Sequence, residues 1–263
     1  MSKTPVSKSE PVLPKKEPVL QCENVVKELG QGAGLVTALK GVSLELVPGE
    51  LTLLMGPSGS GKTTLLSILG GIMTPTSGTL KIAGVPITGM SAEELAKVRR
   101  DHLGFIFQSY NLFPTLNAIE NVRIALDVRG ITGYAATSRA EEVLRDVGLG
   151  HRLTNYPGGL SGGEQQRVAV ARAIASSPSI VLADEPTAAL DSENGQAVME
   201  LLSRVAREQN RCVLAVTHDN RTLGYADRIV RIEDGKIVGE ERRPEGVNSP
   251  EITDLTKRRK LHA

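Results

Sequence analysis

Four short apolar runs, each followed by polar side chains, constrain the fold of this chain more strongly than any other feature of its sequence. The runs are residues 51–55, 104–107, 180–183 and 213–216. Each is too short for an ordinary helix and none alternates between apolar and polar residues, which is typical of strands covered on both faces. Segments with helical patterns lie between the runs, at 63–69, 91–100, 117–128, 138–147, 164–176 and 192–209. Strands that alternate with helices predict an α/β fold with a mostly parallel sheet.

The residues that follow the four runs are all capable of binding or chemistry. A glycine-rich loop follows the first run, Gln108 follows the second, and Asp184 and Glu185 follow the third. Thr217 and His218 follow the fourth. Because ligands of open α/β sheets bind beyond the carboxyl ends of the strands, this pattern predicts one shared site.

The charge balance argues against a protein that coats nucleic acid. The chain has 31 basic and 30 acidic residues, for a formal net charge of +1, whereas such a protein has a strongly basic domain. The two cysteines, Cys22 and Cys212, are too few for a disulfide framework and suit a reducing compartment. No apolar run approaches the ~18–20 residues that span a bilayer, and the N-terminus has no apolar segment typical of a secretory signal. We therefore expect a cytoplasmic protein.

Two polar tails flank the folded part. Residues 1–18 carry four prolines and four lysines and are predicted to be a flexible leader. Residues 241–263 are predicted to be a polar and basic tail, whose cluster at 257–260 is either solvated or in contact with anionic lipid headgroups. One large domain, 19–240, is expected between them.

The glycine-rich loop predicts a site for a nucleoside triphosphate. Residues 56–63, Gly-Pro-Ser-Gly-Ser-Gly-Lys-Thr, fit the phosphate-binding pattern G-x-x-x-x-G-K-[ST]. In that pattern backbone N–H groups converge on phosphate oxygens, and the following helix points its positive end the same way. Lys62 is expected to reach the β- and γ-phosphates, and the Thr63 hydroxyl is expected to ligate Mg²⁺. The nucleotide contacts are expected from Gly56, Pro57, Ser58, Gly59, Ser60, Gly61, Lys62, Thr63 and Thr64.

Two acids at the end of the third run suit the metal side of the same site. Asp184 is expected to hold Mg²⁺, directly or through water. Glu185 is then placed to orient or deprotonate the attacking water.

Residues 160–167, Leu-Ser-Gly-Gly-Glu-Gln-Gln-Arg, predict a capped start of a helix. Ser161 can cap this helix while Glu164 reaches back to it, and two glycines leave the backbone N–H groups uncovered. A helix terminus of this kind can bind a second anion, here the γ-phosphate.

Residues 160–167 resemble the signature motif of ATP-binding cassette (ABC) ATPases, and further motifs agree in order and spacing. Residues 56–63 resemble the Walker A motif of that family, 180–185 its Walker B motif with the catalytic glutamate, and Gln108 its Q-loop. Asp191 ends a stretch similar to the D-loop, and His218 resembles the switch histidine. The resemblance spans about residues 19–240. It implies a P-loop NTPase with a mostly parallel core sheet, an antiparallel β subdomain and a helical subdomain at about 109–177.

The resemblance also implies how the residues act. It implies ATP hydrolysis by a head-to-tail homodimer with two ATP molecules between the P-loop of one subunit and the signature helix of the other. Glu185, His218 and Gln108 are the catalytic residues that it implies, and Thr63, Gln108 and Asp184 are the contacts to Mg²⁺. Ser161, Gly162 and Gly163 would contact the γ-phosphate from the partner, and Asp191 would couple the two sites.

One position departs from the family pattern. The family usually stacks adenine on an aromatic residue shortly before the P-loop strand, and this chain has Leu29 there, with no aromatic residue before Phe105. We therefore expect weaker or less selective binding of the base, unless a neighbour such as Val36 covers the ring.

The stretch 107–121 resembles the lipoprotein-release and macrolide-export branch, and 217–221 resembles the ATPase of heterocyst glycolipid exporters. These resemblances imply a peripheral subunit at the cytoplasmic face of the inner membrane, and a separate permease, with a periplasmic adaptor in some cases. The permease would dock near 111–121, and no nucleic acid partner is implied. The cargo would be a lipid, a lipoprotein or a small molecule.

Two alternatives remain open at this stage. One is a soluble ABC protein that acts on ribosomes or DNA, although these usually carry two cassettes or a long coiled coil. The other is a regulator that uses ATP only to dimerise, against which the intact Asp184, Glu185 and His218 weigh.

Overall fold

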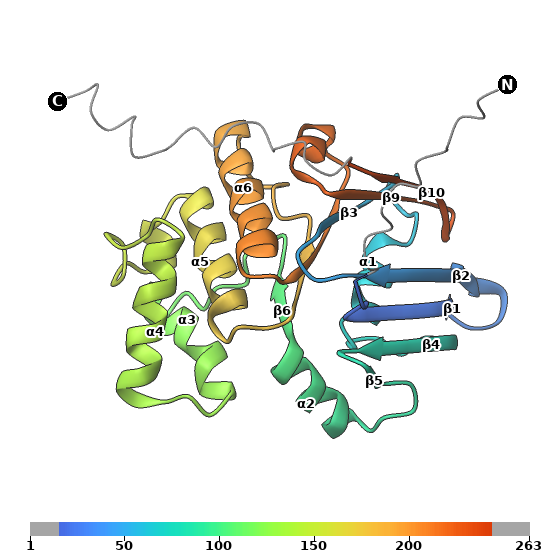
Figure 1. Ribbon diagram of the computed structural model, residues 1–263, viewed down its shortest axis with the longest axis horizontal. Coiled ribbons are helices and arrows are strands. Elements are labelled where there is room, and N and C mark those ends of the chain that lie inside the picture. The colour runs from blue at the N-terminus through green and yellow to red at the C-terminus, as the bar shows by residue number, and fades with distance from the viewer. Residues whose placement is uncertain (1–15, 244–263) are drawn as a thin grey trace, which may run out of the picture.

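The computed structural model describes residues 16–243. Over this range the chain folds into two β-sheets and six α-helices, with helices α3, α4 and α5 at one side and a small sheet at the other (Figure 1). The basic cluster at 257–260, and most of the predicted leader, lie outside the described residues.

The central sheet contains the four strands that the apolar runs predicted. They are β3 (Leu51–Met55), β6 (Leu103–Ile106), β7 (Ile180–Asp184) and β8 (Cys212–Thr217). They lie side by side in the order β3-β8-β7-β6, and every neighbouring pair is parallel. Strand β9 (Arg228–Glu233) extends the sheet parallel to β3, and β10 (Lys236–Arg242) closes it antiparallel to β9. The expectation of a mostly parallel core sheet is confirmed.

Both faces of the four strands β3, β6, β7 and β8 are largely buried, which explains why these strands show no alternation. In β3, Leu51 and Leu53 pack into a core with helices of one side, whereas Leu54 packs into a second core on the opposite face. Each of these side chains is fully buried. The buried polar residue of β3, Thr52, keeps a partner, because its Oγ1 donates to Glu50 Oε1 (2.9 Å).

The second sheet is antiparallel throughout, as the family resemblance implied. Its strands run in the order β2-β1-β4-β5. They are β1 (Leu20–Leu29), β2 (Val36–Leu46), β4 (Ser77–Ile82) and β5 (Val85–Pro86).

Six helices connect and cover the sheets: α1 (Lys62–Leu69), α2 (Ala92–His102), α3 (Ala118–Val128), α4 (Gly133–Asp146), α5 (Gly162–Ala175) and α6 (Ser192–Glu208). Three short 3-10 turns accompany them, at Gly32–Gly34, Pro157–Gly159 and Asn220–Tyr225. Helix α4 begins five residues before the predicted start at residue 138, because its first turn buries only Ala136 and therefore shows almost no apolar pattern. Helices α3, α4 and α5 pack together within the range predicted for a helical subdomain.

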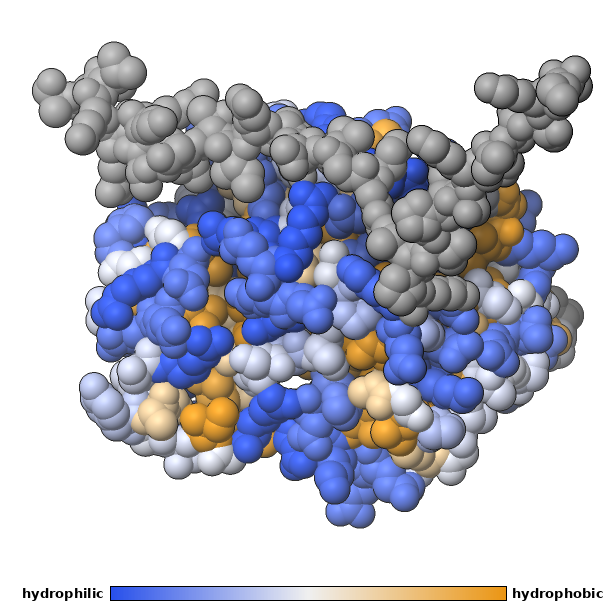
Figure 2. Space-filling view, in the orientation of Figure 1, coloured by the Kyte–Doolittle hydropathy of each residue, from blue (hydrophilic) through white to orange (hydrophobic). Residues whose placement is uncertain are grey.

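The face of the molecule in Figure 2 is mostly hydrophilic, with apolar residues in small separate patches. Within residues 16–243, no helix is both long and apolar enough to cross a membrane. Cys22 and Cys212 are free thiols and both are buried. Burial raises the pKa of Cys22 to about 11 and also raises the pKa of Cys212.

Candidate nucleotide site

The loop between β3 and α1 has the shape of a phosphate cradle. Gly61 is the N-terminal cap of α1 with φ = 99°, and a Cβ at this position would lie 2.7 Å from the carbonyl oxygen of Ala38. Only glycine fits this conformation and this space. The Lys62 side chain is 8% exposed, and its Nζ donates to the carbonyl oxygens of Gly56 (2.7 Å) and Pro57 (2.8 Å). The ammonium group is therefore fixed inside the loop.

A cavity of about 900 Å³ lies over this loop and brings residues together from distant parts of the chain. The ends of three central strands contribute Gln108, Asp184, Glu185 and His218. Of the residues predicted to contact the nucleotide, Pro57, Ser58, Gly59, Gly61, Lys62, Thr63 and Thr64 line the cavity.

Two residues of the loop do not line this cavity. Gly56 lies against the backbone of β9, where a Cβ would be 2.0 Å from the carbonyl oxygen of Ile232. Ser60 is buried, and its Oγ has no hydrogen-bond partner within the described part of the chain. Both residues therefore lie on the side of the loop that faces the protein interior, and they support its conformation without lining the cavity.

A hydroxyl and a carboxylate lie close together in the cavity. Thr63 Oγ1 lies 3.4 Å from Asp184 Oδ1. Burial, together with the neighbouring Glu185, raises the pKa of Asp184 above its ordinary value. No group of three or more acidic, histidine or cysteine residues that could hold a metal occurs within residues 16–243. A sparse set of hard oxygen ligands fits Mg²⁺, which keeps several waters and binds through one or two carboxylates and substrate phosphates.

Glu185 has an unusual backbone conformation. Its φ is 46°, in the left-handed region that non-glycine residues rarely adopt, and its N–H donates to the carbonyl oxygen of Val216 (3.0 Å). Its carboxylate Oε1 lies 2.9 Å from Nδ1 of His218. The strained turn thus directs Glu185 toward the end of β8, where His218 begins the next loop.

The signature-like segment lies apart from this cavity. Ser161 Oγ accepts from the N–H of Glu164, and the Glu164 carboxylate accepts from the N–H of Ser161, so the predicted capping box is present. Ser161, Gly162, Gly163 and Asp191 do not line the cavity around the P-loop.

The N-termini of α5 and α6 pack closely against each other. Asp191 caps α6, accepting from the backbone N–H (2.9 Å) and the side-chain Nδ2 (2.7 Å) of Asn194. These hydrogen bonds hold the pKa of Asp191 below its ordinary value. A Cβ on Gly163 would lie 2.1 Å from Asn194 Oδ1, so Gly163 is required by packing as well as by any role in binding.

Comparison with known proteins identifies the family. Residues 39–188 match the family described as ABC transporter. The chain belongs to the ABC transporter family. This ABC-type ATPase is 43% identical over 228 residues to the uncharacterized ABC transporter ATP-binding protein MJ0796 of Methanocaldococcus jannaschii, covering 85% of this chain and 97% of that protein. The solved dimeric structure of a post-hydrolysis state of that cassette, bound to ADP and Pi, matches this chain with a TM-score of 0.79 and 41% identity, over 86% of this chain and 99% of that one.

Other relatives are longer than the ABC ATPase described here. An uncharacterized ABC transporter ATP-binding protein of Mycobacterium bovis is 46% identical over 218 residues, which cover 83% of this chain and 66% of that protein. The macrolide export ATP-binding/permease protein MacB of Marinobacter nauticus is 42% identical over 221 residues, 84% of this chain and 34% of that protein. The chain thus spans a little under two thirds of the Mycobacterium bovis protein and about one third of MacB.

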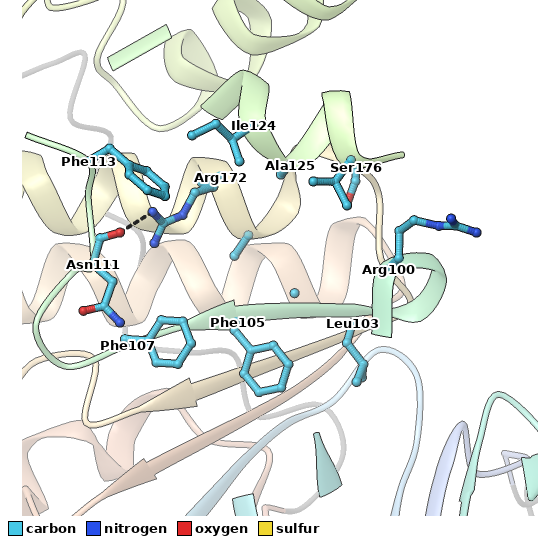
Figure 3. A pocket seen from close by; sticks show the side chains of 13 residues that line it. Arg100, Leu103, Phe105, Phe107, Asn111, Phe113, Ile124, Ala125, Arg172 and Ser176 are labelled. Atoms are coloured by element: carbon cyan, nitrogen blue, oxygen red, sulfur yellow. Dashed lines mark hydrogen bonds between the residues drawn. The ribbon is translucent and has the colours of Figure 1, made fainter. Parts of the chain in front are cut away.

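A second cavity of the ABC ATPase, of about 320 Å³, lies between β6 and the helices α3 and α5 (Figure 3). Phe105, Phe107 and Phe113 line it, together with Arg172 from α5. The rings of Phe105 and Phe107 are stacked, with centroids 5.9 Å apart. Sequence reasoning did not single out Arg172, because an arginine in a helix rich in alanine and arginine carries no distinguishing signal.

Proposed function

We propose that this chain powers export or extrusion through a separate membrane permease, by hydrolysing MgATP as a head-to-tail homodimer. The observation that carries the proposal is the division of the predicted site residues. The P-loop, Gln108, Asp184, Glu185 and His218 share one cavity, whereas residues 161–163 lie outside it. The simplest explanation is that a second subunit provides the N-terminus of its own α5 helix to this cavity.

The dimeric arrangement of the M. jannaschii cassette supports this view. By analogy, Ser161, Gly162 and Gly163 of one subunit would contact the γ-phosphate held by the P-loop of the other. Asp191, at the start of α6 beside Gly163, would couple the two sites across the interface.

Within the cavity the proposed roles follow from position. Lys62 and the backbone N–H groups of the loop bind and orient the phosphates. Thr63, Asp184 and Gln108 would hold Mg²⁺, which neutralises charge on the phosphates when bound. Glu185 would accept a proton from the attacking water, and the Nδ1–H of His218 would orient the Glu185 carboxylate, 2.9 Å away.

The base would lie at the end of β1. Leu29 and Val36 line the cavity beside the P-loop and are 38% and 62% exposed. Two aliphatic side chains offer apolar contact to adenine without an aromatic stack, which supports weaker selection of the base.

The permease would dock near residues 111–121, where the second cavity opens between β6 and α3. The similarity to MacB supports an export system, with a lipid, lipoprotein or small molecule as cargo. The chain would lie at the cytoplasmic face of the inner membrane. The complex would be similar to heterocyst glycolipid exporters, and the permease would be joined to a periplasmic adaptor.

The test is a tagged pull-down of the Glu185→Gln variant from detergent-solubilised native membranes with ATP present, followed by mass spectrometry. This variant should bind ATP and remain a dimer because its turnover is almost abolished, so a permease should copurify. Lys62→Ala, which should not bind ATP, is the matched control and should dimerise less. Ribosomal or DNA-repair proteins without a membrane protein would refute the transport proposal, and near-normal turnover of Glu185→Gln would refute the proposed role of Glu185.

A further inference from the structure

The loop after Gln108 contains two consecutive residues in a rare backbone conformation. Tyr110 has φ = 60° and Asn111 has φ = 49°. Left-handed conformations are unfavourable for most residues with a Cβ, and asparagine tolerates them better than tyrosine. Tyr110 therefore persists in this conformation only where the surroundings hold it. The Asn111 side chain is exposed, so its own packing does not supply that support.

Arg172 supports the turn from outside the loop, in addition to the N–H of Asn111, which donates to the carbonyl oxygen of Ser109 (2.6 Å). The Arg172 guanidinium donates from Nη1 to the carbonyl oxygen of Asn111 (2.5 Å) and from Nη2 to the carbonyl oxygen of Tyr110 (2.8 Å). Figure 3 shows this side chain reaching from α5 to the loop. Among residues 16–243, no carboxylate forms an ion pair with Arg172, so the two carbonyl oxygens are its polar partners there. A planar fork of donors is suited to two adjacent acceptors, and lysine cannot reproduce it.

We propose that Arg172 is a positioning residue for ATP hydrolysis, because it fixes the left-handed turn that places Gln108 in the nucleotide cavity. Gln108 lies two residues before Tyr110 and lines that cavity, whereas Arg172 lies on α5 and lines the second cavity. This inference rests on the proposed role of Gln108. It adds that Arg172 makes the position of Gln108 depend on α5.

The same turn also reaches the signature-like segment. A Cβ on Gly162 would lie 3.0 Å from the hydroxyl of Tyr110, so the tyrosine tip lies against the N-terminal turn of α5. Arg172 holds the same loop from the last turn of α5. The loop is therefore attached to both ends of one helix, and a shift of α5 must be transmitted to Gln108.

The test compares Arg172→Lys with Arg129→Lys, a matched variant of another arginine that binds backbone carbonyl oxygens. Arg129 likewise donates to backbone carbonyl oxygens, those of Arg100, Asp101 and Ser176, but it does not touch the loop after Gln108. In the purified full chain, Arg172→Lys should lower kcat about tenfold or more, since small misplacements of a positioning group have effects of this size. It should also raise the Mg²⁺ concentration needed for half-maximal activity. Arg129→Lys should lower thermal stability and leave the Mg²⁺ dependence unchanged.

Two further variants separate positioning from loss of folding. Asn111→Gly lowers the cost of the left-handed conformation at one of its two positions, so Arg172→Lys combined with Asn111→Gly should recover part of the lost kcat. Asn111→Val leaves Arg172 intact but disfavours the turn, and it should reproduce the defect. Equal effects of the two lysine variants on Mg²⁺ dependence, or no recovery with glycine, would overturn the proposal.

The Gln108→Ala variant distinguishes failure of this inference from failure of the proposed function. If Gln108→Ala slows turnover, Arg172→Lys should add little in that background, because both changes act through the same side chain. Additive losses would overturn the role of Arg172 alone. Full turnover by Gln108→Ala would overturn the role of Gln108, and that of Arg172 with it.

Discussion

At the scale of single residues, the strained backbone of Glu185 predicts that replacing this residue affects the stability of the chain and its turnover in different ways. With φ = 46°, this position favours glycine over any residue that has a Cβ. Glu185→Gly should therefore be more stable than Glu185→Ala by about 1 kcal/mol, the reverse of the usual order, while both variants lack turnover. Urea unfolding of the two variants measures the difference. Glu200, inside helix α6, is the control, where alanine should be the more stable replacement; an alanine preference at both positions would contradict the strain.

Asp184 should make the folded chain less stable at neutral pH. Burial raises its pKa, so the ionised carboxylate is less favourable in the folded chain than in the unfolded chain. This cost is present above the raised pKa and disappears as the pH falls toward about 4, the ordinary range for aspartate, because the folded chain takes up the proton first. Asp184→Asn should therefore raise the free energy of unfolding at pH 7 and have little effect near pH 4.

Asp219 supplies the control for this pH dependence. Hydrogen bonds from Arg221 lower the pKa of Asp219, so its ionised form stabilises the fold at neutral pH and this contribution is lost as the pH falls. Asp219→Asn should accordingly lower the free energy of unfolding at pH 7. The same sign of change for Asp184→Asn would show that the burial of Asp184 is not a net cost.

Leu29 should limit affinity for the base. An aromatic ring at this exposed edge of the cavity could stack on adenine, which contributes roughly 1–3 kcal/mol per base in nucleic-acid complexes. Leu29→Tyr should therefore tighten ATP binding by about fivefold or more. A fluorescent ATP analogue measures this, with Leu35→Tyr as the control, because Leu35 is 51% exposed and does not line the cavity. Equal effects at the two positions would contradict a base site at Leu29.

At the scale of elements, the junction of α5 and α6 should reverse the usual effect of removing a helical glycine. Gly163→Ala should destabilise the chain by roughly 1–3 kcal/mol, because its Cβ would overlap Asn194. Gly195→Ala, in α6, should be neutral or stabilising by up to about 1 kcal/mol, because a Cβ there lies 3.6 Å from Thr187 in ordinary contact. Thermal unfolding of both variants tests the junction; a stable Gly163→Ala variant would mean that Asn194 moves aside freely.

The elements differ in how far local sequence determines them. The central strands were predictable because both faces are buried, and the start of α5 because Ser161 and Glu164 cap it reciprocally. The start of α4 was not, because its first turn lacks a buried stripe. The left-handed backbone of Glu185 and the clamp between Arg172 and the loop at 110–111 also escaped prediction. These features depend on neighbours that are distant in sequence, which no local pattern encodes.

At the scale of the whole molecule, a site shared between two subunits should allow two inactive chains to restore activity together. In the proposed head-to-tail dimer, Lys62→Ala should inactivate the P-loop side of a site and Ser161→Arg should inactivate the signature side. In a mixed head-to-tail dimer, one site combines both defects and the other combines both intact halves. An equal mixture should therefore regain at most about a quarter of wild-type ATPase activity, since half of the dimers are mixed and each has one intact site. A mixture that remains as inactive as either variant, while native mass spectrometry shows that mixed dimers have formed, would contradict two independent sites shared between the subunits.

Because both native cysteines are buried, the folded chain should react only slowly with thiol reagents. Thiolate is the reactive form, and burial raises the pKa of Cys22 to about 11 and also that of Cys212. A single cysteine introduced on the surface would then be the one site labelled by a maleimide dye, without prior removal of native cysteines. In the proposed head-to-tail dimer, dyes placed on α5 and near the P-loop would report whether the two subunits approach each other during hydrolysis.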